Sequence, residues 1–152
     1  MRGPASIIGD RRVLSVNESA ERSNTNETSL IAIAAIEVVA GLALLSCPSF
    51  TVALLIGSGL DNSAAVTLGR VAGAALSALG LVCWLARDDT HSRAARGLVI
   101  TMLLYNVAVA AILAFAGLGF GLHGIALWPA VVLHTMMAVW CSACLQRSPQ
   151  TT

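Results

Sequence analysis

Residues 64–86 read AAVTLGRVAGAALSALGLVCWLA, and this stretch decides the fold class. A membrane helix needs about 20 mostly apolar residues to cross about 30 Å of hydrocarbon, and this stretch is long enough with a single charge, Arg70. It lacks the alternation of polar and apolar residues that marks a barrel strand. Because lipid offers no hydrogen bonds to the backbone, the stretch predicts a transmembrane α-helix.

Three further apolar stretches, 30–47, 97–118 and 122–145, predict an all-α, four-helix transmembrane bundle. The chain has 152 residues, of which 57% are hydrophobic and only 11% are charged, and its mean hydropathy is +0.79. This composition excludes a wholly disordered chain. A net charge of +1 argues against nucleic-acid binding, and a soluble enzyme of this composition would expose too much apolar surface.

Pro48 interrupts the first apolar stretch, which continues to Leu60. Residues 49–60 are too few to span a membrane alone. They form either the tail of a kinked first helix or a short helix at the membrane face, and proline is well tolerated where a helix begins.

Arginine side chains are distributed unevenly between the connections. Four lie in residues 1–28, three between the second and third spans, and one in residues 147–152. By the positive-inside rule, both termini are expected to be cytoplasmic. We therefore expect a disordered polar tail over 1–28, a four-span domain over 29–146 and a short tail over 147–152. All nine basic residues are arginine, which hints at a bacterial protein, so the expected location is the bacterial inner membrane.

Small residues recur at every fourth position of the second span, at Gly69, Gly73 and Ser77. This spacing lets two helix backbones approach closely. The stripe predicts either packing within the bundle or a face for self-association.

Within the apolar stretches, Glu37 is the acidic residue and Arg70 is the basic residue. Such residues in a membrane span are often functional. A rise of about 1.5 Å per residue places Glu37, Asn106 and His134 in the cytoplasmic half of the bundle, with Tyr105 at a similar depth. The sequence leaves open a Glu37–Arg70 pair. The cluster predicts either a proton-coupled site, since histidine changes charge near neutral pH, or hydrogen bonds that only fix packing.

Redox, haem and zinc chemistry are weakly supported. The pair Cys141 and Cys144 lies at the expected cytoplasmic end, where thiols stay reduced, and Cys47 has no evident mate. His123 and His134 lie about 16 Å apart along one helix, too far to share a haem. We expect no cofactor, no metal and no catalytic residue.

Four segments carry a resemblance to a known group: IEVVAGLALL (36–45), GRVAGAALSALGLVCWLAR (69–87), LLYNVAVAAIL (103–113) and WPAVVLH (128–134). Over about residues 30–145 the chain resembles small four-helix bacterial membrane proteins of unknown function, DoxX-like in layout. That resemblance implies an inner-membrane bundle. The chain is also similar to small multidrug transporters in having one Glu in its first span, here Glu37.

The expected function is that of a small integral inner-membrane protein without enzymatic activity, acting as a membrane subunit or a bundle. The alternative is a small homo-oligomeric proton- or cation-coupled transporter or channel that uses Glu37. Its expected partners are the lipid bilayer and either a second copy or a larger membrane complex, with no nucleic acid.

Overall fold

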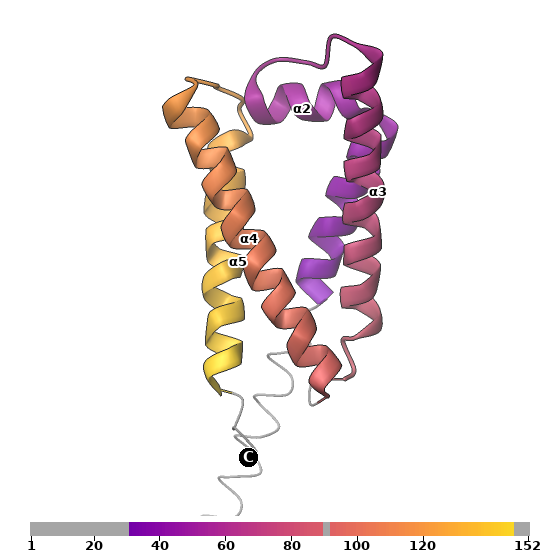
Figure 1. The fold of residues 1–152 in the computed structure, drawn as a ribbon, viewed down its shortest axis with the longest axis vertical. Coiled ribbons are helices and arrows are strands. Elements are labelled where there is room, and N and C mark those ends of the chain that lie inside the picture. Colours follow the sequence, from indigo (N-terminus) through magenta and orange to yellow (C-terminus); the bar gives the residue numbers. More distant parts are fainter. Residues whose placement is uncertain (1–30, 90–91, 148–152) are drawn as a thin grey trace, which may run out of the picture.

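The computed structural model describes residues 31–89 and 92–147, which form helices joined by short connections (Figure 1). The fold is all-α, as the sequence predicts. The expected tail 1–28 and residues 148–152 lie outside the described residues. In chain order the elements are a first helix Ile31–Ser46, then α2 (Pro48–Ile56), α3 (Ser63–Leu85), α4 (Arg93–Gly119) and α5 (Leu127–Arg147).

Within the described part of the chain, α3, α4 and α5 are each long and apolar enough to cross a membrane. The first helix and α2 pass the same test only as a pair, and they are bent by 117° relative to each other. Residues 31–89 and 92–147 therefore contain three helices able to span a membrane, or four if the bent pair counts as one span.

The bend falls at Pro48, where the sequence is interrupted. Proline has no N–H to donate to the preceding turn, so it ends the first helix and begins the next one. The sequence allowed either a kinked tail or a separate short helix, and the structure has the separate helix. It ends at Ile56, because Gly57 takes a left-handed conformation with φ of 85°.

The helix boundaries differ from the expected ones where local hydrogen bonds decide them. The Ser92 hydroxyl accepts a bond from the Ala95 N–H at 3.0 Å, so α4 begins at Arg93 rather than near residue 97. The last helix begins at Leu127 rather than near residue 122. The segment before it is held on α2 instead, where the Ala126 N–H donates to the Leu54 carbonyl at 2.9 Å.

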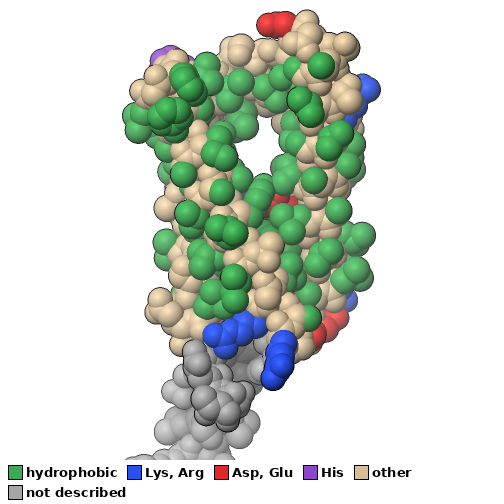
Figure 2. Space-filling model, viewed as in Figure 1, with side chains coloured by type: hydrophobic (Ala, Val, Ile, Leu, Met, Phe, Trp, Pro, Cys, Tyr) green, Lys and Arg blue, Asp and Glu red, His purple; other side chains and the backbone are tan. Residues whose placement is uncertain are grey.

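Figure 1 shows two helix pairs, the first helix beside α3 and α4 beside α5, with α2 lying across one end. The first helix begins, and α5 ends, at the opposite end from α2, where α3 also connects to α4. Between the pairs, below α2, the space-filling view shows an opening through the molecule (Figure 2). The two pairs meet again farther from α2.

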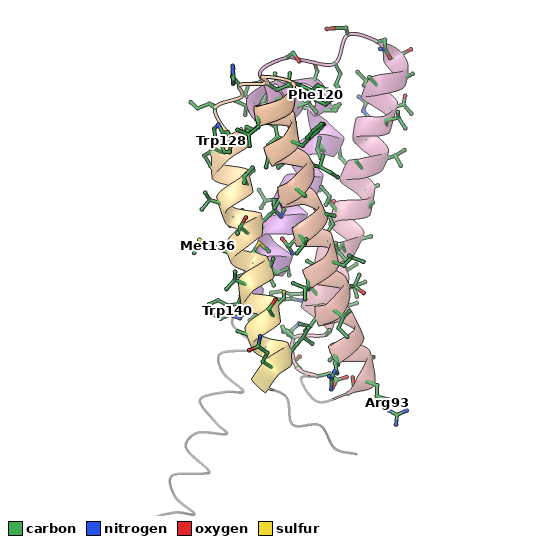
Figure 3. The ribbon with its side chains drawn as sticks, turned by 60° about the vertical axis from the view of Figure 1, so that its left-hand side comes forward. Arg93, Phe120, Trp128, Met136 and Trp140 are labelled. Atoms are coloured by element: carbon green, nitrogen blue, oxygen red, sulfur yellow. The ribbon has the colours of Figure 1, made fainter. Side chains whose placement is uncertain are left out.

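The outer surface of the helices is apolar, as a lipid-facing surface must be (Figure 2). From α5, Trp128, Met136 and Trp140 point outward, whereas Arg93 projects from the end of the molecule opposite α2 (Figure 3). Large exposed apolar side chains of this number are unusual for a soluble monomer and indicate a membrane protein.

Candidate intramembrane polar site

The first helix is held against α3 by glycine, and this contact fixes where Glu37 lies. A Cβ atom built on Gly73 would lie 2.7 Å from the Gly41 carbonyl oxygen, and one on Gly80 would lie 2.8 Å from that of Ala34. Both distances are shorter than any side chain tolerates, so the two backbones touch directly.

The predicted packing residues of α3 all lie along this contact. A Cβ on Gly69 would meet the Pro48 ring at 3.1 Å, and Ser77, whose hydroxyl donates to the Gly73 carbonyl at 2.9 Å, lies against Gly41. The stripe is therefore covered by the chain's own first helix. A self-association surface, if the protein has one, must be sought elsewhere on the molecule.

Glu37 is buried, with 2% of its surface exposed, and it contacts the other helix pair. The Tyr105 hydroxyl on α4 donates to Glu37 Oε2 at 3.3 Å. The second oxygen, Oε1, is also buried and has no hydrogen-bond partner among the described residues. Buried polar atoms are nearly always hydrogen-bonded, so an unsatisfied carboxylate oxygen calls for an explanation.

Asn106 joins α4 to α5 at the same level. Its side-chain amide donates to the Met102 carbonyl at 2.8 Å, which turns Oδ1 toward His134 Nδ1 at 2.7 Å. Because Oδ1 can only accept, Nδ1 of His134 is the donor in this contact. In a neutral ring, Nε2 is then left as a proton acceptor.

Tyr105 links the two interactions into one layer. Its ring packs edge-on against the ring of His134, with centroids 5.9 Å apart and an interplanar angle of 81°. Neighbouring residues on a helix point about 100° apart. Tyr105 therefore reaches the first helix while Asn106 reaches α5. We call Glu37, Tyr105, Asn106 and His134 the polar layer.

Of the residues expected at this site, the structure brings Glu37, Asn106 and His134 to one level but leaves Arg70 apart. Arg70 is exposed, and it follows Gly69, which lies against Pro48. The first helix rises about 16 Å between Glu37 and Pro48. Within the described residues, Arg70 forms no ion pair with Glu37 or with Asp61.

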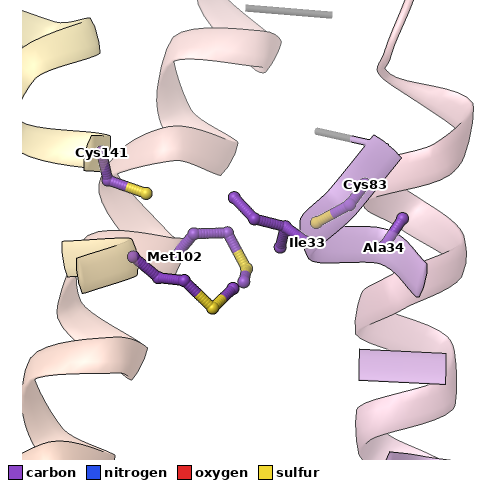
Figure 4. Packing of buried hydrophobic residues seen from close by; sticks show 6 residues of the cluster. Ile33, Ala34, Cys83, Met102 and Cys141 are labelled. Atoms are coloured by element: carbon purple, nitrogen blue, oxygen red, sulfur yellow. The ribbon is translucent and has the colours of Figure 1, made fainter. Parts of the chain in front are cut away.

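A second layer of buried side chains lies next to the polar layer and is rich in sulfur. Its members are Ile33, Ala34, Cys83, Met102, Met137 and Cys141, and Tyr105 packs against it (Figure 4). We call Cys83, Met102, Met137 and Cys141 the sulfur cluster. Met102 lies four residues before Asn106, and Ile33 lies four residues before Glu37, so the two layers are about 6 Å apart.

Sequence reasoning placed Tyr105 at the right depth but gave it no partner, and it missed the sulfur cluster. A signal for the cluster exists in the spacing, because Met137 and Cys141 follow His134 by one and two turns on the same face. Nothing in the sequence indicates that Cys83, on α3, faces them.

The remaining candidates do not come together as a classical metal or disulfide site. Cys47, Cys83, Cys141 and Cys144 all belong to the described residues, and none of them forms a disulfide there. Among the described residues, no group of three or more His, Cys, Asp or Glu side chains is placed to hold a metal ion. His123 is exposed in the connection between α4 and α5.

Comparison with protein-family models, with curated proteins and with solved structures finds no match to this chain.

Proposed function

We propose that this chain is a non-enzymatic integral membrane protein, a small transporter in which Glu37 binds a proton or a cation. The observation that carries the proposal is the buried Glu37 Oε1, which lacks a hydrogen-bond partner in the described part of the chain. Leaving a buried polar atom unsatisfied costs about 1–3 kcal/mol, and more for a charged group. A bound proton or cation removes that cost.

The position of Glu37 supports the same proposal. Its carboxylate lies where the first helix meets α4, and the opening below α2 leads toward the level at which the helix pairs meet (Figure 2). The hydrogen bond from Tyr105 to Glu37 joins the two helix pairs. A cation that binds Glu37 and alters this bond therefore shifts one helix pair relative to the other. Transporters of this kind couple binding at the bilayer midplane to rocking of one bundle against the other.

Four spans with both termini in the cytoplasm of a bacterial inner membrane complete the proposal. The arginine bias supports this orientation, and Arg87, Arg93 and Arg96 all belong to the α3–α4 end of the molecule. A reporter fused after Thr152 should show that this end of the chain lies in the cytoplasm. A reporter signal from outside the membrane would overturn the proposed orientation.

Flux through proteoliposomes tests the role of Glu37. The purified protein is reconstituted with a pH-sensitive dye inside, and proton flux is recorded under an imposed membrane potential. The Glu37→Gln variant keeps the size of the side chain and should abolish the flux while the protein remains folded. Asp61→Asn, an acid in the exposed connection before α3, is the matched control and should retain it.

Either of two results would overturn proton transport through Glu37: no proton flux by the native protein, or full proton flux by the folded Glu37→Gln variant. The native mass of the gently extracted protein tests its partners. Homo-oligomers agree with a self-sufficient transporter, whereas co-purification with a larger complex makes the chain a membrane subunit.

A further inference from the structure

We infer that the cation bound by this protein is a soft, monovalent metal ion of the Cu(I) or Ag(I) type, held between the thioether sulfurs of Met102 and Met137 and balanced by the Glu37 carboxylate. This inference rests on the proposed function, because it names the chemical class of the cation that Glu37 serves.

The composition of the buried core is the first observation. Four of the six residues in the cluster carry sulfur, and they come from three different helices, α3, α4 and α5. The thiols of Cys141 and Cys83 point from opposite sides toward the space that Met102 and Ile33 occupy (Figure 4). Thioether and thiol sulfurs are the donors that Cu(I) prefers, and harder ions prefer oxygen.

The burial of the two methionines is the second observation. Met102 is fully buried and Met137 is 7% exposed, whereas Met136, the neighbour of Met137, is 66% exposed. A methionine in a core is often only a flexible apolar filler. Here, however, two methionines and two cysteines from three helices pack in one buried cluster.

The charge balance is the third observation. A cation in a low-dielectric interior must be compensated by a nearby negative charge. Glu37 is the buried acid of the described chain, and Tyr105, which donates to its Oε2, also packs against the sulfur cluster. Its unsatisfied Oε1 therefore lies in the neighbourhood of the sulfur cluster. A monovalent ion and one carboxylate together are neutral, whereas a divalent ion would leave a buried charge.

Helix connectivity places these groups in line. Glu37 follows Ile33 by four residues, and Asn106 follows Met102 by four residues, so an ion passes from one layer to the next over about 6 Å. The thioethers bind as neutral ligands, and no bond to hydrogen is broken.

Titration with Ag(I), in nitrate buffer without thiols, tests the inference on the full chain in detergent. Every protein carries Cys47→Ala and Cys144→Ala, because these two thiols lie outside the sulfur cluster and would bind silver by themselves. The paired change Met102→Leu and Met137→Leu keeps the volume of the core. It should weaken Ag(I) binding at least tenfold, whereas Met136→Leu, the matched control, should leave it unchanged. Native binding should persist in excess Na⁺.

Silver-edge X-ray absorption gives a second readout, with sulfur neighbours expected in the native protein and fewer in the paired variant. Binding within twofold of the control, or displacement of Ag(I) by Na⁺, would overturn the inference. The outcomes separate the two proposals. Suppose that Glu37→Gln abolishes proton flux but the methionine changes leave silver binding intact. The proposal of transport through Glu37 is then supported, and the inference of a soft metal ion at the methionines is overturned. The reverse result leaves a silver site without transport.

Discussion

The first helix has two contacts of opposite character. Toward α3 it presents backbone to backbone, with Gly41 against Gly73 and Ala34 against Gly80, and the one hydroxyl at this contact, that of Ser77, is bonded to the Gly73 carbonyl of its own helix. Toward α4 it presents the Glu37 carboxylate to the Tyr105 hydroxyl at 3.3 Å. The first contact is made by fixed shape, and the second by one long hydrogen bond beside the apolar cluster that Ile33 shares with Met102.

This difference between the two contacts indicates which parts of the molecule can move. Close-packed backbones resist displacement, because small shifts lose many van der Waals contacts at once. A hydrogen bond between side chains breaks and re-forms at little cost, and in membrane proteins such bonds are worth about 0.6 kcal/mol on average. The first helix and α3 therefore form one rigid unit, and the polar layer is where the two pairs can separate.

The largest expected effect comes from filling the glycine contact. Gly73→Ala places a Cβ 2.7 Å from the Gly41 carbonyl, so the helices must separate, and the protein should lose about 1–3 kcal/mol of stability. Thermal unfolding in detergent measures the loss. Gly97→Ala is the control, because a Cβ there meets nothing within 4 Å and alanine favours helix by about 1 kcal/mol. Equal stability of the two variants would contradict the rigid contact.

A smaller effect is expected in the polar layer. In a double-mutant cycle, Asn106→Ala and His134→Ala should show a coupling of about 0.6–1.7 kcal/mol, because the 2.7 Å bond joins them directly. Asn106→Ala combined with Arg70→Ala should be additive, since Arg70 lies on α3 away from this layer. Additive behaviour of the Asn106 and His134 changes would refute the bond.

The smallest effect is expected at Tyr105. Tyr105→Phe keeps the ring that packs on the sulfur cluster and removes the hydroxyl, so stability should fall by about 0.5–1 kcal/mol. Thr101→Val, on the same helix, removes an exposed hydroxyl bonded to its own helix at the Gly97 carbonyl and should change stability less. Indistinguishable unfolding curves for Tyr105→Phe and the native protein would argue that the hydroxyl does not support Glu37.

The amino-acid sequence by itself determined the fold class, the helical stretches and the break at Pro48. These follow from local properties, namely the length of an apolar run and the missing N–H of proline, which do not depend on distant residues. Depth along each helix follows from a constant rise of about 1.5 Å per residue, and it placed Glu37, Asn106 and His134 in one region.

Only the tertiary structure decided which side chains meet. Depth does not give the rotation of a helix about its axis, so the Tyr105 bond to Glu37 and the approach of Cys83 to Cys141 could not be read from spacing. The way α3 packs also keeps Arg70 away from the polar layer. Gly69, the residue before Arg70, contacts Pro48 at the other end of the first helix. Rotation is set by packing against neighbouring helices, and packing is a property of the whole chain.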